Sequence, residues 1–304
     1  MGFGNKIWQP WCVGEVEALP VLKAAYDLGI NTWDTANIYS NGECQRIVRK
    51  DVKEYKIPRD KLVIMMKCFC AVGEDPDMQT LLSPAILPEV NVSLERLGLG
   101  CIDLLQIYRV DPETPPEVTT EALHDLVKSG KVRYIGASSM CLYQQDAERN
   151  RTKFISMQNH YSVVYREEER DIIPYCRSTG VGRIPCSPLA RGHLTRLPTL
   201  ETDSVRKDIE TKFANLPLFA MGTSEVDKKT ISRIKEIADK KGWAMARLRL
   251  PGFWWIRRRS ESLLGTAKAE RAADMLGLKG KSLDESEVKY LEELYVSREI
   301  SGHV

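Results

Sequence analysis

The stretch CIDLLQIYRV, residues 101–110, is an almost continuous apolar run. A strand with one solvent-exposed face alternates apolar and polar residues, whereas a strand buried on both faces, as in a parallel sheet, does not. The flanking segments 87–98 and 116–130 repeat their apolar residues at helical spacing. The sequence therefore predicts an α/β fold in which this strand lies inside a parallel sheet, with one helix before it and one after it.

The same alternation of strand and helix extends in both directions. We expect further strands at 30–36, 61–69, 131–139, 154–162, 181–188 and 262–267, and further helices at 15–29, 141–150, 167–180, 224–242 and 283–296. Such alternation builds right-handed βαβ units, and no linker divides the chain, so we predict one domain over residues 1–304. No GxGxxG motif follows an early strand, which favours a closed (β/α)8 TIM barrel over an open doubly wound sheet.

Composition narrows the classes of partner. The 304 residues carry 44 Lys+Arg against 42 Asp+Glu, a net charge of +2, which gives no electrostatic footprint for nucleic acid. No basic segment followed by an apolar one opens the chain, and no apolar run approaches a membrane span, so we expect a cytoplasmic protein without membrane contact. Its eight cysteines lack paired CxxC spacing, and we expect reduced thiols and no metal site.

Candidate catalytic residues stand at the strand ends, where the active sites of barrels lie. Asp34 ends the strand 30–36, Tyr39 follows it, and Lys67 lies in the strand 61–69. A neighbouring ammonium lowers the pKa of a phenol, and a carboxylate keeps a buried ammonium charged, so the three together form a general acid. Each residue alone also has a structural interpretation: a capping aspartate, a wedged tyrosine and a lysine at a strand end.

Seven segments, in order, resemble the aldo-keto reductase family, and in particular its fungal branch of aryl-alcohol-dehydrogenase-like and secondary-metabolite enzymes. They are NTWDTANIYSNGE, KLVIMMKCF, CIDLLQIYRVDPETP, KVRYIGASSM, FISMQNHY, IPCSPLARG and LLGTAKAER. The resemblance implies a TIM barrel that reduces an aldehyde or ketone with NADPH. It also implies that Tyr39 protonates the carbonyl oxygen while Lys67 and Asp34 tune Tyr39.

The resemblance also implies a set of residues that hold NADP(H). The nicotinamide end would be held by Asp34, Ser138, Ser139 and Gln158. The pyrophosphate would be wrapped by Ser187, Pro188, Leu189, Ala190, Arg191 and Gly192, and the adenosine end by Gly265, Thr266, Lys268 and Arg271. A lysine and an arginine at a helix start suit a 2′-phosphate, which favours NADPH over NADH. A solvated first helical turn is the alternative interpretation of Lys268 and Arg271.

Several positions depart from the family pattern. Tyr108 stands where the family has a catalytic histidine; a phenol can donate a hydrogen bond to a carbonyl but cannot act as an imidazolium. Cys186 replaces an aromatic residue that stacks on nicotinamide in the family, and we expect an N-terminal hairpin and most of the first strand to be missing. Two functions follow: a reductase of an aryl or polyketide-like carbonyl compound, or a catalytically impaired nucleotide-binding regulatory or scaffold member. The sequence does not predict an oligomeric state.

Overall fold

The computed structural model describes residues 1–68, 72, 86–140, 151–198, 222–249, 263, 265–276 and 283–301. Two compact units divide the chain. One unit contains Met1–Met157 and Gly265–Ala272, and the other contains Gln158–Leu264 and Ala273–Gly302. The expected helix at 141–150 lies outside the described residues, and the prediction of one domain over 1–304 stays a prediction.

Among the described residues, six strands are hydrogen-bonded in chain order, β1-β2-β3-β4-β5-β6, and each lies in a segment where the sequence predicts a strand. Their bounds are Thr32–Asp34 (β1), Val63–Cys68 (β2), Ile102–Ile107 (β3), Val132–Ser138 (β4), Phe154–Gln158 (β5) and Gly182–Arg183 (β6). The β1–β2, β2–β3 and β3–β4 pairs are parallel. Every residue of β3 is buried, which confirms the interpretation of its apolar run.

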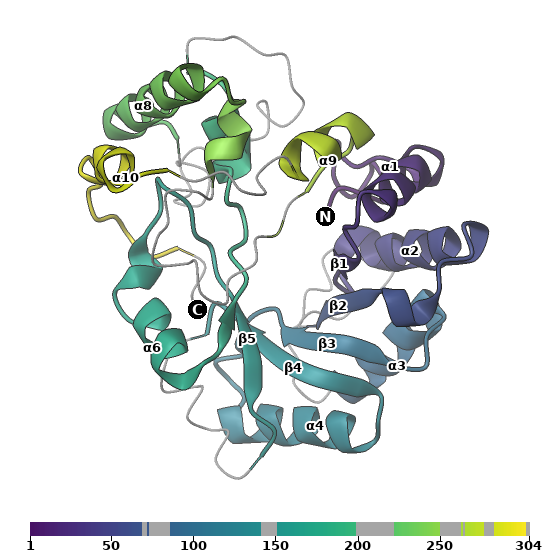
Figure 1. Ribbon diagram of the computed structural model, residues 1–304. Helices are drawn as coiled ribbons and strands as arrows, with labels where there is room; N and C mark the ends of the chain where they lie inside the picture. The colour runs from purple at the N-terminus through teal and green to yellow at the C-terminus, as the bar shows by residue number, and fades with distance from the viewer. Residues whose placement is uncertain are drawn as a thin grey trace. The chain divides into compact units, whose positions relative to one another are not determined.

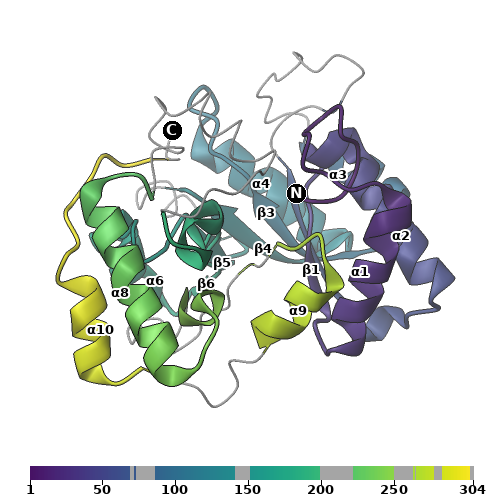
Figure 2. The ribbon, with the colours of Figure 1, turned by 90° about the horizontal axis from the view of Figure 1, so that it is seen from above.

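The helices of the first unit cover the outer face of this sheet. They are α1 (Glu15–Asp27), α2 (Glu43–Glu54), α3 (Ile86–Leu97) and α4 (Pro116–Lys128), with short 3-10 helices at Tyr39–Gly42 and Arg59–Lys61. Figure 1 shows α2, α3 and α4 along one side of β1–β4, and Figure 2 shows α1, α2 and α3 on the outer side of the strands. Helix α2 is absent from the sequence prediction. Helix α9 (Ala269–Leu276) begins in this unit.

The second unit is mainly helical. Its helices are α6 (Ile172–Thr179), α8 (Glu225–Lys241) and α10 (Glu285–Glu292), with short 3-10 helices at Glu167–Glu169, Ala190–Thr195 and Met245–Arg249. Helices α8 and α10 lie side by side in both views (Figures 1 and 2), and their buried apolar residues belong to one cluster that includes Ile234 and Leu291.

The expected last strand at 262–267 is not formed by its described residues, 263 and 265–267. The Leu263 amide donates to the Pro185 carbonyl at 3.1 Å, as a ladder residue would. The chain then turns at Thr266, whose hydroxyl accepts a hydrogen bond from the Lys268 amide at 3.1 Å. Helix α9 begins directly after this turn. Closure into an eight-stranded barrel and the missing N-terminal hairpin stay predictions.

The register of β1–β4 decides which polar residues meet. Lys67 pairs with Gln106, Gln106 pairs with Gly136, and Asp34 pairs with Met65, two residues before Lys67. Side chains two residues apart on a strand share a face. Asp34, Lys67 and Gln106 are therefore placed on one face of the sheet, close to the carboxyl ends of their strands.

Candidate active site

An ion pair between Asp34 and Lys67 lies on this face. The Lys67 side chain is 1% exposed and the Asp34 side chain 11%. The Lys67 ammonium donates to Asp34 Oδ2 and, at 3.2 Å, to the Thr35 carbonyl. A buried ammonium stays charged only where a counter-ion and further acceptors compensate its lost hydration, and both are present here.

Two tyrosine rings lie against the same ammonium. The Lys67 Nζ is 5.3 Å from the centroid of the Tyr39 ring and 6.0 Å from that of Tyr108. The two ring centroids are 6.2 Å apart, and the ring planes meet at 84°. The structure thus brings together Asp34, Lys67, Tyr39 and Tyr108, the four predicted catalytic candidates.

A sharp turn sets the position of Tyr39. Ser40, Asn41 and Gly42 follow it with φ angles of 49°, 54° and 86°, all in the left-handed region. The N-terminal segment packs on this turn: the Asn5 amide donates to the Ser40 hydroxyl at 3.1 Å, and the Trp8 ring lies 6.1 Å from the Tyr39 ring. Residues far apart in sequence therefore hold the tyrosine in place.

Gln106 belongs to the same cluster, and the sequence analysis missed it. Its side-chain amide donates to Asp34 Oδ1 at 3.2 Å, while Lys67 bonds the other carboxylate oxygen. The available signal was an amide inside a strand expected to be buried on both faces, where a polar side chain needs a partner.

Apart from Asp34, the predicted cofactor residues of the first unit lie at two places. Ser138 and Ser139 are buried at the end of β4, and Ser139 has a φ of 49°. Gly265 and Thr266 precede α9, and the side chains of Lys268 and Arg271 are exposed at its start.

The remaining predicted cofactor residues belong to the second unit. Gln158 is buried at the end of β5. A tight loop is formed by Ser187, Pro188, Leu189, Ala190, Arg191 and Gly192. The Ala190 amide donates a hydrogen bond to the Ser187 carbonyl and the Gly192 amide to the Leu189 carbonyl, both at 2.8 Å. Four of these residues have positive φ angles: Ser187, Ala190, Arg191 and Gly192. Cys186, before this loop, forms a parallel bridge with His160.

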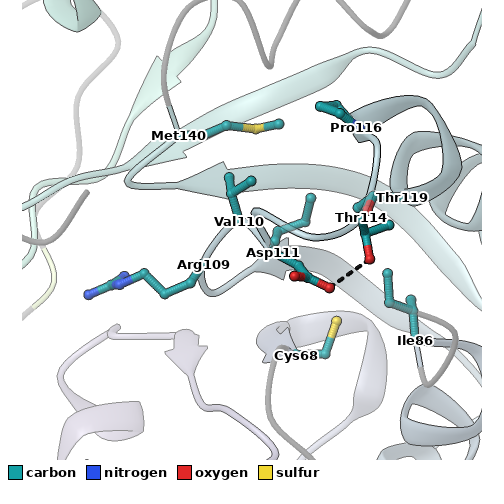
Figure 3. Close-up of a pocket in the computed structure, with 10 residues that line it drawn as sticks. Cys68, Ile86, Arg109, Val110, Asp111, Thr114, Pro116, Thr119 and Met140 are labelled. Carbon is teal, nitrogen blue, oxygen red and sulfur yellow. Dashed lines mark hydrogen bonds between the residues drawn. The ribbon is translucent and has the colours of Figure 1, made fainter. Parts of the chain in front are cut away.

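A cavity opens at the carboxyl ends of β2, β3 and β4 (Figure 3). Its empty space is about 470 Å³, counting the part open to solvent, and Cys68, Ile107 and Met140 line it together with the starts of α3 and α4. Cys68 follows Lys67 and Ile107 follows Gln106, so they point to the opposite face of the sheet. None of the described lining residues belongs to the cluster around Lys67. The cavity therefore lies on the opposite face of the sheet from this cluster.

Other chemistries find little support in the described residues. Burial raises the pKa of the Cys68 thiol to about 12, so this thiol is neutral and a poor nucleophile. Within the described part of the chain, no three His, Cys, Asp or Glu residues gather as a metal site would require, and no helix has the length and apolar character to cross a membrane.

Comparisons with known proteins show which family this chain resembles. The model of the aldo/keto reductase family matches residues 1–296. The chain is 45% identical to the aldo-keto reductase dtxS3 of Metarhizium robertsii, with 99% of this chain and 87% of the relative covered. It is 40% identical to the versiconal hemiacetal acetate reductase of Aspergillus parasiticus, covering 99% and 93%.

A solved structure supports the fold as well. The thermostable aldo-keto reductase Tm1743 superimposes with a TM-score of 0.72 at 24% identity, over 92% of this chain and 88% of that one.

In addition, C750.01 of Schizosaccharomyces pombe, whose name assigns it to the aryl-alcohol dehydrogenases, is 41% identical over the full length of both chains. The chain belongs to the aldo/keto reductase family, whose members are oxidoreductases that use a nicotinamide cofactor.

Proposed function

We propose that the protein reduces an aldehyde or ketone with NADPH and that Tyr39 donates the proton. The observation that carries this proposal is the buried Asp34–Lys67 pair with the Tyr39 and Tyr108 rings against its ammonium. A fixed cation beside a phenol favours the phenolate left after proton donation. A positioned general acid contributes roughly 10²- to 10⁴-fold to a proton-transfer reaction.

Each residue of the cluster has a separate role in this proposal. Tyr39 donates its hydroxyl proton to the carbonyl oxygen, and Lys67 stabilises the negative charge that develops. Asp34 keeps Lys67 in place and charged. Tyr108, in the histidine position, donates a hydrogen bond that polarises the carbonyl.

The residues present fit a phosphorylated nicotinamide cofactor. Lys268 and Arg271 are exposed at the start of α9, where the helix dipole adds to their positive charge. Ser138, Ser139 and Gln158 offer hydroxyl and amide groups that match a carboxamide, and the tight loop 187–192 would hold the pyrophosphate. When bound, the nicotinamide supplies the hydride to the carbonyl carbon.

The substrate in this proposal is an aryl or polyketide-like carbonyl compound. Two observations support this class. Phe3, Trp8 and Tyr108 pack against the buried cluster that contains Tyr39 and offer aromatic faces. A relative is named for the reduction of versiconal hemiacetal acetate.

The test measures NADPH oxidation by the purified protein with a panel of aryl aldehydes and ketones. We expect turnover with NADPH and weaker activity with NADH. The double variant Lys268→Ala and Arg271→Ala should raise the Kd for NADPH roughly 10- to 100-fold, because each removes a charge-assisted hydrogen bond, and should leave the Kd for NADH nearly unchanged. NADPH binding without turnover on the whole panel would instead identify the nucleotide-binding, catalytically impaired alternative.

A further inference from the structure

Gln106 is a buried amide in the middle of the sheet. Its side chain is 0% exposed, and it stands in one cross-strand row with Lys67 on β2 and Gly136 on β4. Burying an amide without hydrogen bonds costs free energy, and an apolar residue of similar size would pack there at no such cost. The position of this amide is therefore explained by what it contacts.

Its contact completes the bonding of the Asp34 carboxylate. The Gln106 Nε2 donates to Asp34 Oδ1 at 3.2 Å, and the Lys67 Nζ donates to Oδ2. One donor on each oxygen fixes the rotation of the carboxylate about its own axis. With one donor only, the group can turn and carry the ammonium with it.

The neighbouring strand leaves room for this amide. A Cβ added at Gly136 would lie 3.2 Å from the Gln106 Cγ and 2.3 Å from the Ser156 Oγ. A side chain at this position would press on Gln106 from the β4 side. Gly136 thus leaves space for the Gln106 side chain on the β4 side.

We propose that Gln106 is a positioning residue for the reaction: it holds the Asp34 carboxylate so that the Lys67 ammonium stays against the Tyr39 and Tyr108 rings. The proposal rests on the proposed function, because it assigns Lys67 a part in proton donation by Tyr39. In this role Gln106 acts through its hydrogen bond to Asp34 and through the Asp34–Lys67 pair. Small displacements of a catalytic group lower the rate without weakening substrate binding.

The first test is kinetic. Gln106→Met keeps the length of the side chain and removes the donor, and it should lower kcat roughly 10- to 100-fold, the loss typical of a hydrogen bond to a charged group. The KM for the carbonyl substrate should change less than about twofold, because the interaction matters after substrate binding. Ser93→Ala, which removes another fully buried polar group, on α3, serves as the matched control and should keep the wild-type kcat.

The second test uses rescue by protonation. Gln106→Glu introduces an acid that donates to Asp34 only when it carries a proton. The ratio of the kcat of Gln106→Glu to the kcat of Gln106→Met should therefore increase roughly tenfold when the pH is lowered from about 8 to about 5. A purely structural role for Gln106 predicts a constant ratio, and a constant ratio would overturn the proposal.

The third test separates this proposal from the proposed function. In a crystal structure of Gln106→Met, we expect the Asp34 carboxylate to be rotated and Lys67 to be displaced from the wild-type position. Unchanged Asp34 and Lys67 side chains would overturn the positioning role even if the rate falls. If the wild type reduces no carbonyl compound, the proposed function fails, and the positions of Asp34 and Lys67 still decide the role of Gln106.

Discussion

The carboxyl group of Asp51 makes the stability of the first unit depend on pH. Asp51 lies in α2, its side chain is 0% exposed, and neither carboxylate oxygen has a hydrogen-bond partner. Burial is the main cause that raises its pKa to about 7 from 3.8; the like charge of Glu54 adds to the rise, and Lys23 on α1 opposes it. The folded state therefore favours the protonated acid.

The sign and size of the effect follow from proton linkage. The folded pKa lies above the unfolded one, so the contribution of Asp51 is fully present below about pH 4 and is lost as the pH rises through about 7. At about 1.4 kcal/mol for each tenfold change in proton affinity, the loss above neutrality is on the order of 4 kcal/mol. An isosteric neutral side chain avoids this loss.

The experiment compares Asp51→Asn with the wild type by urea unfolding, followed by circular dichroism. The free energies of unfolding should agree near pH 4 and differ by about 4 kcal/mol near pH 8, with the variant more stable. Asp60→Asn, at a side chain that is 75% exposed, is the control and should show no such trend. If the wild type were as stable as Asp51→Asn at pH 8, the claim that a buried, unpaired Asp51 carboxylate destabilises the fold would be refuted.

Three further perturbations test other parts of the structure. Gly42→Ala should lower the free energy of unfolding by about 1–3 kcal/mol, because the φ of Gly42 is 86° and the new Cβ would lie 2.8 Å from the Arg96 side chain. It should also lower kcat, because Gly42 belongs to the turn that follows Tyr39. Unchanged urea unfolding would contradict this. Arg298→Ala should lower the free energy of unfolding by about 3–5 kcal/mol, because it removes the guanidinium that bonds Asp227 at 2.7 Å, and the Asp227 side chain is only 1% exposed. A loss below about 1 kcal/mol would contradict this. Lys67→Met should abolish carbonyl reduction, measured as turnover, while thermal unfolding shows that the protein still folds. Retained turnover would contradict the role of the Lys67 ammonium in proton donation.

The elements with strong apolar patterns were predictable, and the exceptions have physical causes. The run at 101–110 identified β3, and the amphipathic segment 224–242 identified α8. Helix α2 was missed because two of its buried positions are Gln45 and Asp51, which interrupt the apolar stripe that marks a helix.

The site shows the same division. Asp34, Lys67 and Tyr39 were found because their residue types and strand-end positions fit one chemistry. Gln106 was missed because the register of β2, β3 and β4 decides that it faces Asp34, and register is a tertiary property that the local pattern does not contain. The roles of the cofactor residues stay predictions that the binding experiments address.

Replacement of one oxygen atom tests the central claim most directly. Tyr39→Phe removes the proposed proton donor and keeps the ring that packs against Trp8 and Tyr108. With an aryl aldehyde that the wild type reduces, the account predicts that kcat for NADPH oxidation falls roughly 10²- to 10⁴-fold while the Kd for NADPH is unchanged. A variant that retains the wild-type kcat would contradict the assignment of Tyr39 as the proton donor.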